Sequence, residues 1–178
     1  MAVLCRAVFL LLCGIGVPSV PALAQVPMPL EPVSATQDLE PVLRSLFLTI
    51  AMLSDYPAPE ALPPVFQVPQ LVIEAKVCDE PCNVSAAYVP REGIYLAENL
   101  DPVHEPLDGS VLLHELVHYL QQGHPKFAHL AGCERERAKE QEAYAIQNAY
   151  LAMINARQRA VFYDGEFDCG GAESARAP

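Results

Sequence analysis

Residues 111–122 read VLLHELVHYLQQ, and this stretch contains the strongest structural signal in the chain. Its apolar residues recur at helical spacing, as on a helix with one face in a hydrophobic core; they are Val111, Leu112, Leu116, Val117 and Leu120. His114 and His118 are four residues apart, so a helix projects both imidazoles from one face, about one turn apart. We therefore predict a helix over residues 106–122 that carries two histidines side by side.

The segment His114-Glu115-Leu116-Val117-His118 has the pattern H-E-x-x-H, and its chemistry follows from the spacing. Two imidazoles one turn apart can bind one Zn²⁺ through ring nitrogens at about 2.0–2.1 Å. Glu115 can reach a metal-bound water, which the metal makes more acidic, and take its proton as a general base. The motif stands in an apolar helical run, where burying these polar groups without a metal would be costly. A metal site is therefore favoured over an ordinary amphipathic helix with solvated histidines. The motif predicts a zinc site with His114 and His118 as ligands and Glu115 as the catalytic base.

The third ligand is sought downstream of the motif. A site with three histidines needs a glycine at position 121, where Gln121 stands, so His124 fits that pattern by count only. A second helix, predicted over residues 134–160, offers carboxylates instead: Glu134, Glu136, Glu140 and Glu142. A glutamate on an antiparallel partner helix would complete a site of two histidines and one carboxylate with an open fourth position. Glu140 and Glu142 point about 200° apart on a helix, so only one of them can serve from a given face.

The pairing of His114-Glu-x-x-His118 with Glu140-Gln-Glu-Ala-Tyr144 resembles the gluzincin zinc metallopeptidases, particularly their minimal single-domain bacterial forms. In that family the glutamate ligand commonly opens an E-x-x-A or E-x-x-x-D pattern on the following helix. The resemblance implies Glu140 as the third ligand, with Glu142 as the alternative if the apolar stripe that begins at 142 faces the motif helix. It places Tyr144 where an aspartate usually supports the first histidine.

The same resemblance implies a zincin-like domain over residues 37–178 that hydrolyses peptide or protein substrates. It also implies an edge strand that binds extended peptide, for which Ile94-Tyr95-Leu96 is the candidate. The alternative function is a secreted zinc-binding or interaction domain that keeps the scaffold without catalysis.

The rest of the chain predicts a helix followed by a sheet. Residues 38–53 have apolar residues at helical spacing. Residues 71–77 and 84–89 are rich in β-branched and aromatic residues, and a turn at 90–93 leads to a further short strand at 94–96. The order helix, sheet, helix, helix predicts an α+β fold with a small antiparallel sheet packed on helices.

The N-terminus predicts export. A basic start precedes the apolar run 7–17, and Ala22-Leu23-Ala24 supplies a cleavage site, so residues 1–24 are predicted to be a signal peptide cut after Ala24. Residues 25–36 are rich in proline and predict an extended linker. The mature protein is therefore expected to be secreted or periplasmic, without membrane contact after cleavage.

Four cysteines remain in the mature chain, and an even number in an exported protein suggests two disulfides with three possible connectivities. We favour Cys78–Cys82, which closes a tight loop, together with Cys133–Cys169, which closes a long one. The formal net charge is −11 and no basic stripe is present. Nucleic acid and anionic membranes are therefore not expected as partners.

Overall fold

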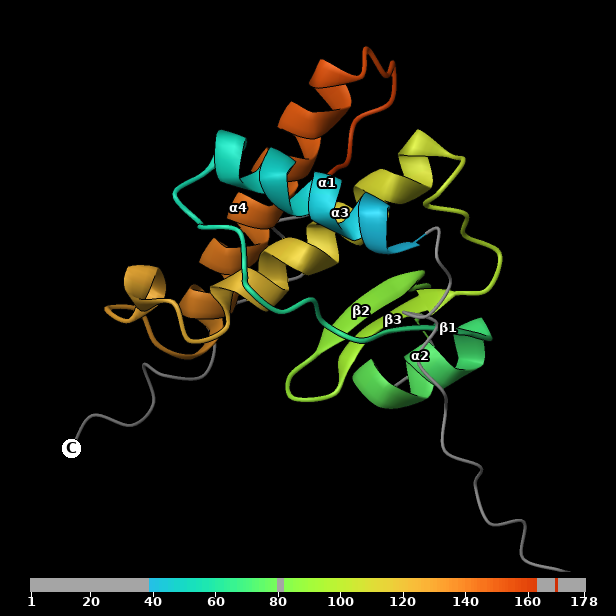
Figure 1. Ribbon diagram of the computed structural model, residues 1–178. Coiled ribbons are helices and arrows are strands. Elements are labelled where there is room, and N and C mark those ends of the chain that lie inside the picture. The colour runs from blue at the N-terminus through green and yellow to red at the C-terminus, as the bar shows by residue number, and fades with distance from the viewer. Residues whose placement is uncertain (1–38, 80–81, 163–168, 170–178) are drawn as a thin grey trace, which may run out of the picture.

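The computed structural model describes residues 39–79, 82–162 and 169. Its elements, in chain order, are α1 (Leu39–Leu53), β1 (Val65–Val68), α2 (Gln70–Val77), β2 (Ala86–Val89), β3 (Gly93–Ala97), α3 (Pro106–Gln121), the 3₁₀ turn η2 (Pro125–Phe127) and α4 (Gly132–Met153). The predicted α+β class is confirmed. Helices α1, α3 and α4 lie on one side of the sheet and α2 on the other (Figure 1). The signal peptide and the linker predicted for residues 1–36 lie outside the described residues.

The sheet has three strands in the order β1-β3-β2, and it is mixed. β2 and β3 form the predicted hairpin, with Tyr88 opposite Ile94, whereas β1 runs parallel to β3, with Val65 opposite Ile94. The prediction of an antiparallel sheet is therefore wrong for one of its two strand pairs. The edge-strand candidate Ile94-Tyr95-Leu96 is also wrong, because β3 is the central strand with partners on both sides. Among the described strands, β2 is the edge strand that contacts α3, where the Tyr88 amide donates to Glu115.

Residues 71–77 form most of helix α2, so the strand predicted there is wrong. Pro69 is the N-cap of this helix, and Ile73 is its one buried residue, against the sheet face opposite α3. Leu71, with 76% of its surface exposed, points to solvent. The β-branched composition suggested a strand, but one buried residue per two turns matches a short helix lying over a sheet.

The turn at 90–93 is confirmed. The amide of Glu92 donates to the carbonyl of Val89 at 3.1 Å, and Arg91 has a φ of 71°. Gly93, at a φ of 140°, lies where a side chain would collide with the backbone carbonyl of Pro64. That carbonyl accepts from the amide of Ile94 at 2.9 Å, so the glycine permits β1 to approach β3.

The central strand β3 joins two apolar clusters. Ile94 and Leu96 are fully buried among α1, α3 and α4, while Tyr95 and Ala97 face α2 on the opposite side. This alternation is what a strand buried on both faces requires. The main cluster fixes α3 against the sheet through Leu112, Leu113, Leu116 and Val117, all with no exposed surface.

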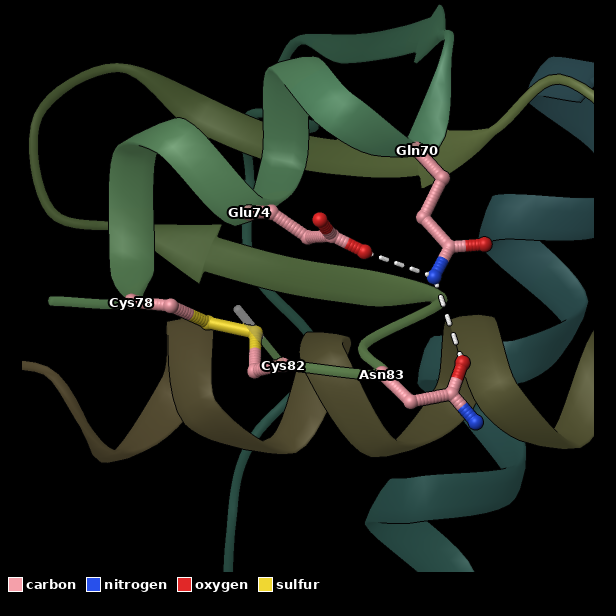
Figure 2. Close-up of a disulfide and its surroundings, with 5 residues drawn as sticks. All are labelled: Gln70, Glu74, Cys78, Cys82 and Asn83. Atoms are coloured by element: carbon pink, nitrogen blue, oxygen red, sulfur yellow. Dashed lines mark hydrogen bonds between the residues drawn. A yellow bond between two sulfur atoms is a disulfide. The ribbon is translucent and has the colours of Figure 1, made fainter. Parts of the chain in front are cut away.

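Both predicted disulfides are present, Cys78–Cys82 and Cys133–Cys169. The first follows α2 directly, and Figure 2 shows Gln70, at the start of α2, bridging Glu74 and Asn83 at 2.9 and 3.2 Å. These contacts tie the loop before β2 to α2. Within the described part of the chain, no helix has the length and apolar character needed to cross a membrane.

Candidate metal centre

The motif helix α3 begins where predicted, with Pro106 in its first turn, and it ends at Gln121. Its partner α4 is shorter than predicted, ending at Met153 instead of residue 160. Beyond that point the chain turns back, with Asn155 at a positive φ of 55°. Both histidines of the motif and Glu115 lie on the face of α3 that meets α4 and β2; His114 and Glu115 are 8% and 7% exposed.

His114, His118 and Glu140 converge on one point, with one ligating atom of each within 4.8 Å of the others. The two Nε2 atoms of the histidines are 3.0 Å apart. The Glu140 carboxylate lies 3.3 Å from Nε2 of His114 and 3.1 Å from Nε2 of His118. Of the two glutamates considered from the sequence, the structure brings Glu140 to the histidines. This group could hold a metal ion.

The outer nitrogens of both imidazoles face side-chain amide oxygens. His114 Nδ1 lies 3.1 Å from Oε1 of Gln147, and His118 Nδ1 lies 2.9 Å from Oε1 of Gln121. An amide oxygen only accepts, so each Nδ1 donates its proton and Nε2 of each ring is the nitrogen that faces Glu140. Two ring nitrogens and a carboxylate therefore point at the same place. That donor set fits a divalent cation, which would take the place of any proton shared between these Nε2 atoms and the carboxylate.

The charges at the site are strongly coupled. Burial alone would lower the pKa of His118, but its hydrogen bond to Glu140 and the charge of Glu115 outweigh burial and raise that pKa to about 9. Burial would raise the pKa of Glu140, but its bonds to His114 and His118 lower it to about 2. The site thus favours a carboxylate facing positive charge, whether a proton or a metal supplies that charge.

Glu115 lies beside the three converging residues without belonging to them. Its Oε2 accepts a hydrogen bond from the backbone amide of Tyr88 on β2 at 2.7 Å. A cleft of about 720 Å³ opens here, lined on one side by β2 and the loop before it, and on the other by α4. The carboxylate is therefore placed between the sheet edge and the histidines, where it can exchange a proton with a group in the cleft.

The resemblance places Tyr144 in support of His114, but Tyr144 is not the partner of Nδ1 of His114. Its ring packs edge-on against the His114 imidazole, with centroids 4.6 Å apart, and Gln147 takes the Nδ1 position one turn later on α4. Sequence reasoning missed Gln147 and Gln121. Neither residue belongs to the apolar stripes predicted for the two helices, so the sequence carried no signal for them.

Glu142 lies outside the metal centre and has its own partners. Its carboxylate accepts from the hydroxyl of Tyr56 at 2.5 Å and from the amide of Gln121 at 3.1 Å, and it pairs with Lys126 at 2.5 Å. Burial opposes ionisation of Glu142, but Lys126 and Tyr56 together lower the pKa of its carboxyl. Glu134 and Glu136 do not join the metal centre.

The segment after α4 forms part of the cleft wall. Ala160 is held by two hydrogen bonds to the Asn148 side chain, both 2.9 Å. Phe162 then packs on Tyr144, with ring centroids 5.7 Å apart, and both rings line the cleft. The Cys133–Cys169 disulfide ties the chain farther on to the start of α4. Residues 160–162 therefore run back along α4 from Asn148 to Tyr144.

Comparison with known proteins identified one family. The family model described as "Domain of unknown function (DUF6647)" matches residues 37–162, well over half of the chain. This span contains α1 to α4 and every residue of the candidate metal centre. No curated protein and no solved structure matches the chain.

Proposed function

This chain belongs to the DUF6647 family, and from the geometry of its cleft we propose that it is a zinc-dependent hydrolase of peptide bonds. The observation that carries the proposal is the convergence of His114, His118 and Glu140 on one point with Glu115 beside them. Two imidazoles and one carboxylate are the ligand set of catalytic zinc sites, which leave a position open for water or substrate. Structural zinc sites usually close all four positions with protein groups.

In this proposal His114, His118 and Glu140 hold the metal, and Glu115 is the general base. When bound, Zn²⁺ would lower the pKa of a coordinated water and polarise a substrate carbonyl. One carboxylate oxygen of Glu115 is held by the amide of Tyr88, which leaves Oε1 to accept a proton and return it to the leaving amine. The arrangement supports placement of this chain among the gluzincin-type peptidases, with α3 and α4 as the two ligand helices.

A peptide substrate is favoured by the edge of the sheet. The amide of Ala97 donates to the carbonyl of Ser85, so residues 85 and 87 pair with β3, and the backbone groups of Ala86 and Tyr88 point the other way. That side of β2 makes no ladder bonds to β3 and borders the cleft, where the Tyr88 amide donates to Glu115. An extended peptide could add to this edge and bring a scissile bond next to the metal centre.

The two disulfides fit an oxidising compartment. Together with the predicted signal peptide, they support a secreted or periplasmic protein. The cleavage of the signal peptide and the formation of the disulfides can both be tested on the secreted product, whose N-terminus should be Gln25.

The test compares the purified chain with Glu115→Gln. Metal analysis should find one equivalent of zinc in both proteins, since Glu115 is not a ligand. A peptide library should be cleaved by the parent protein and at least about a hundredfold more slowly by the variant, because general-base catalysis contributes about 10²–10⁴-fold. Equal rates would defeat the role of Glu115. Bound zinc without any cleavage would favour the alternative, a non-catalytic zinc-binding domain.

A further inference from the structure

The group of polar residues behind His118 consists of Gln121, Glu142, Tyr56 and Lys126, and we call it the His118 support. We propose that Gln121 and Glu142 are positioning residues for the metal centre: Glu142 fixes the orientation of the Gln121 amide, and that amide fixes the orientation of His118. The inference rests on the proposed metal site. It gives a function to a carboxylate that lies near the metal centre but outside it.

The Gln121 side chain has only one orientation that satisfies its surroundings. Its nitrogen donates to two acceptors, the backbone carbonyl of Lys139 at 2.9 Å and the Glu142 carboxylate at 3.1 Å. A rotated amide would turn its oxygen toward two oxygens and lose both bonds. The amide oxygen must therefore face His118 Nδ1, 2.9 Å away. Because Gln121 is only 3% exposed, water has little access to replace any of these partners.

Glu142 is in turn held by residues from distant parts of the chain. Tyr56, 2% exposed, follows α1, and Lys126 belongs to η2 between α3 and α4. Both contact the carboxylate at 2.5 Å, and the Lys126 ammonium also lies over the Tyr56 ring, 5.6 Å from its centroid. The lysine offsets the charge of a partly buried carboxylate, and the tyrosine fixes its direction. The orientation of His118 thus depends on Tyr56, 62 residues earlier in the chain, and on Lys126. Neither side chain belongs to the three residues that would hold the metal.

The His114 side of the centre follows the same principle with neutral groups. The Ser110 hydroxyl donates to the carbonyl of Leu107 at 2.6 Å, so it accepts from the nitrogen of Gln147 at 3.3 Å. The oxygen of Gln147 is therefore left to face His114. This side is supported from α3 and α4 alone, whereas the His118 side depends on a charged residue. A change at Glu142 should therefore affect His118 without disturbing His114.

The experiment measures the affinity of the full chain for Zn²⁺ by competition with a chromophoric chelator. Gln121→Met removes the acceptor, and Gln122→Met is its control, since Gln122 is the exposed neighbour that also lines the cleft. Glu142→Ala removes the orienting carboxylate, and Glu136→Ala deletes the same charge from the cleft side of α4. Loss of groups that orient a ligand typically weakens binding about 10–100-fold, so we expect that range for Gln121→Met and about tenfold for Glu142→Ala. The two controls should stay within about twofold of the parent.

Two further readouts separate positioning from a general loss of structure. Thermal unfolding in excess chelator should show a cooperative transition well above the temperature of the binding assay for each variant and its control, which excludes unfolding as the cause of weaker binding. With Co²⁺ in the site, the visible absorption bands should change in Gln121→Met and Glu142→Ala only, because the imidazole is then free to rotate. If the affinity and the Co²⁺ spectrum of both variants equal those of their controls, the inference is overturned.

The outcomes also separate this inference from the proposed function. If the parent chain binds zinc but cleaves no peptide, and both variants bind zinc more weakly, the positioning role of Gln121 and Glu142 is supported and the hydrolase is defeated. Cleavage by the parent with unchanged zinc affinity in the variants would do the reverse. A parent chain that binds no zinc would overturn both.

Discussion

Replacing Glu140 by glutamine tests which carboxylate completes the metal centre. The change keeps the size of the side chain and removes the charge that lies 3.1 and 3.3 Å from the two histidines. Structural zinc sites have apparent binding free energies of about 10–16 kcal/mol, or about 3 kcal/mol for each of four ligands. Loss of one ligand should therefore weaken zinc binding about a hundredfold.

This loss can be converted into a shift in thermal stability. At a free zinc concentration about a thousand times the parent dissociation constant, binding stabilises the parent by about 4.1 kcal/mol. At the same zinc concentration Glu140→Gln would retain about 1.4 kcal/mol. For a chain of this length each kcal/mol shifts the midpoint by about 3 °C, so zinc should raise the midpoint by about 12 °C in the parent and about 4 °C in the variant.

The assay is thermal unfolding followed by circular dichroism, with and without zinc, for the parent, Glu140→Gln and Glu136→Gln. The last variant is the control, because Glu136 lies one turn earlier on α4 and pairs only with Lys139 among the contacts described. It should respond to zinc as the parent does. If zinc stabilises Glu140→Gln fully while a Glu142→Gln variant loses most of the response, Glu142 is the ligand and the assignment from geometry is refuted.

Three further predictions concern the fold and its pH dependence. Leu113→Ala, at a side chain with no exposed surface beside the motif, should lower the free energy of unfolding by about 2–5 kcal/mol in denaturant titrations. Replacing Cys133 and Cys169 by serine opens a loop with a sequence separation of 36 and should cost about 3–4 kcal/mol; an unchanged midpoint would contradict this. In excess chelator, the raised pKa of His118 contributes stability that is complete below pH 6.5 and is lost as the pH rises through about 9. The lowered pKa of Glu140 contributes stability that is present above pH 4.5 and is lost as the pH falls through about 2, so melting midpoints should decline toward both extremes and not toward one alone.

The features that the sequence predicted correctly are those set by neighbours along the chain. Helix α3 follows from the spacing of its apolar residues, and the placement of His114 beside His118 follows from the geometry of any helix. The hairpin turn follows from a proline and a glycine at positions 90 and 93. The disulfide pairs were favoured by loop length, which is also a property of the chain itself. None of these features requires knowledge of the tertiary contacts.

The errors arose where local preference and tertiary packing disagree. Residues 71–77 have strand-like composition, yet they form α2. In the fold this helix buries the apolar residues on the second face of the sheet, and Ile73 makes the contact. The parallel pairing of β1 with β3 depends on a long-range approach past Gly93, which no local pattern encodes. The edge strand was misassigned for the same reason, since the order of strands is a property of the whole sheet.

The carboxylate that meets His114 and His118 shows most clearly what only the tertiary structure decided. Alanines are frequent on α4 and suit a core or a surface equally well, so its apolar stripe could be drawn through Glu142 or through Glu140. In the folded chain the buried stripe passes through Ala143, Ile146 and Gln147, and Glu140 lies on that face one turn earlier. The sequence determined that His114 and His118 share one face of α3, with Glu115 next to His114. The rotation of α4 about its own axis, set by its packing against α3, determined which carboxylate meets them and which one holds Gln121 in place.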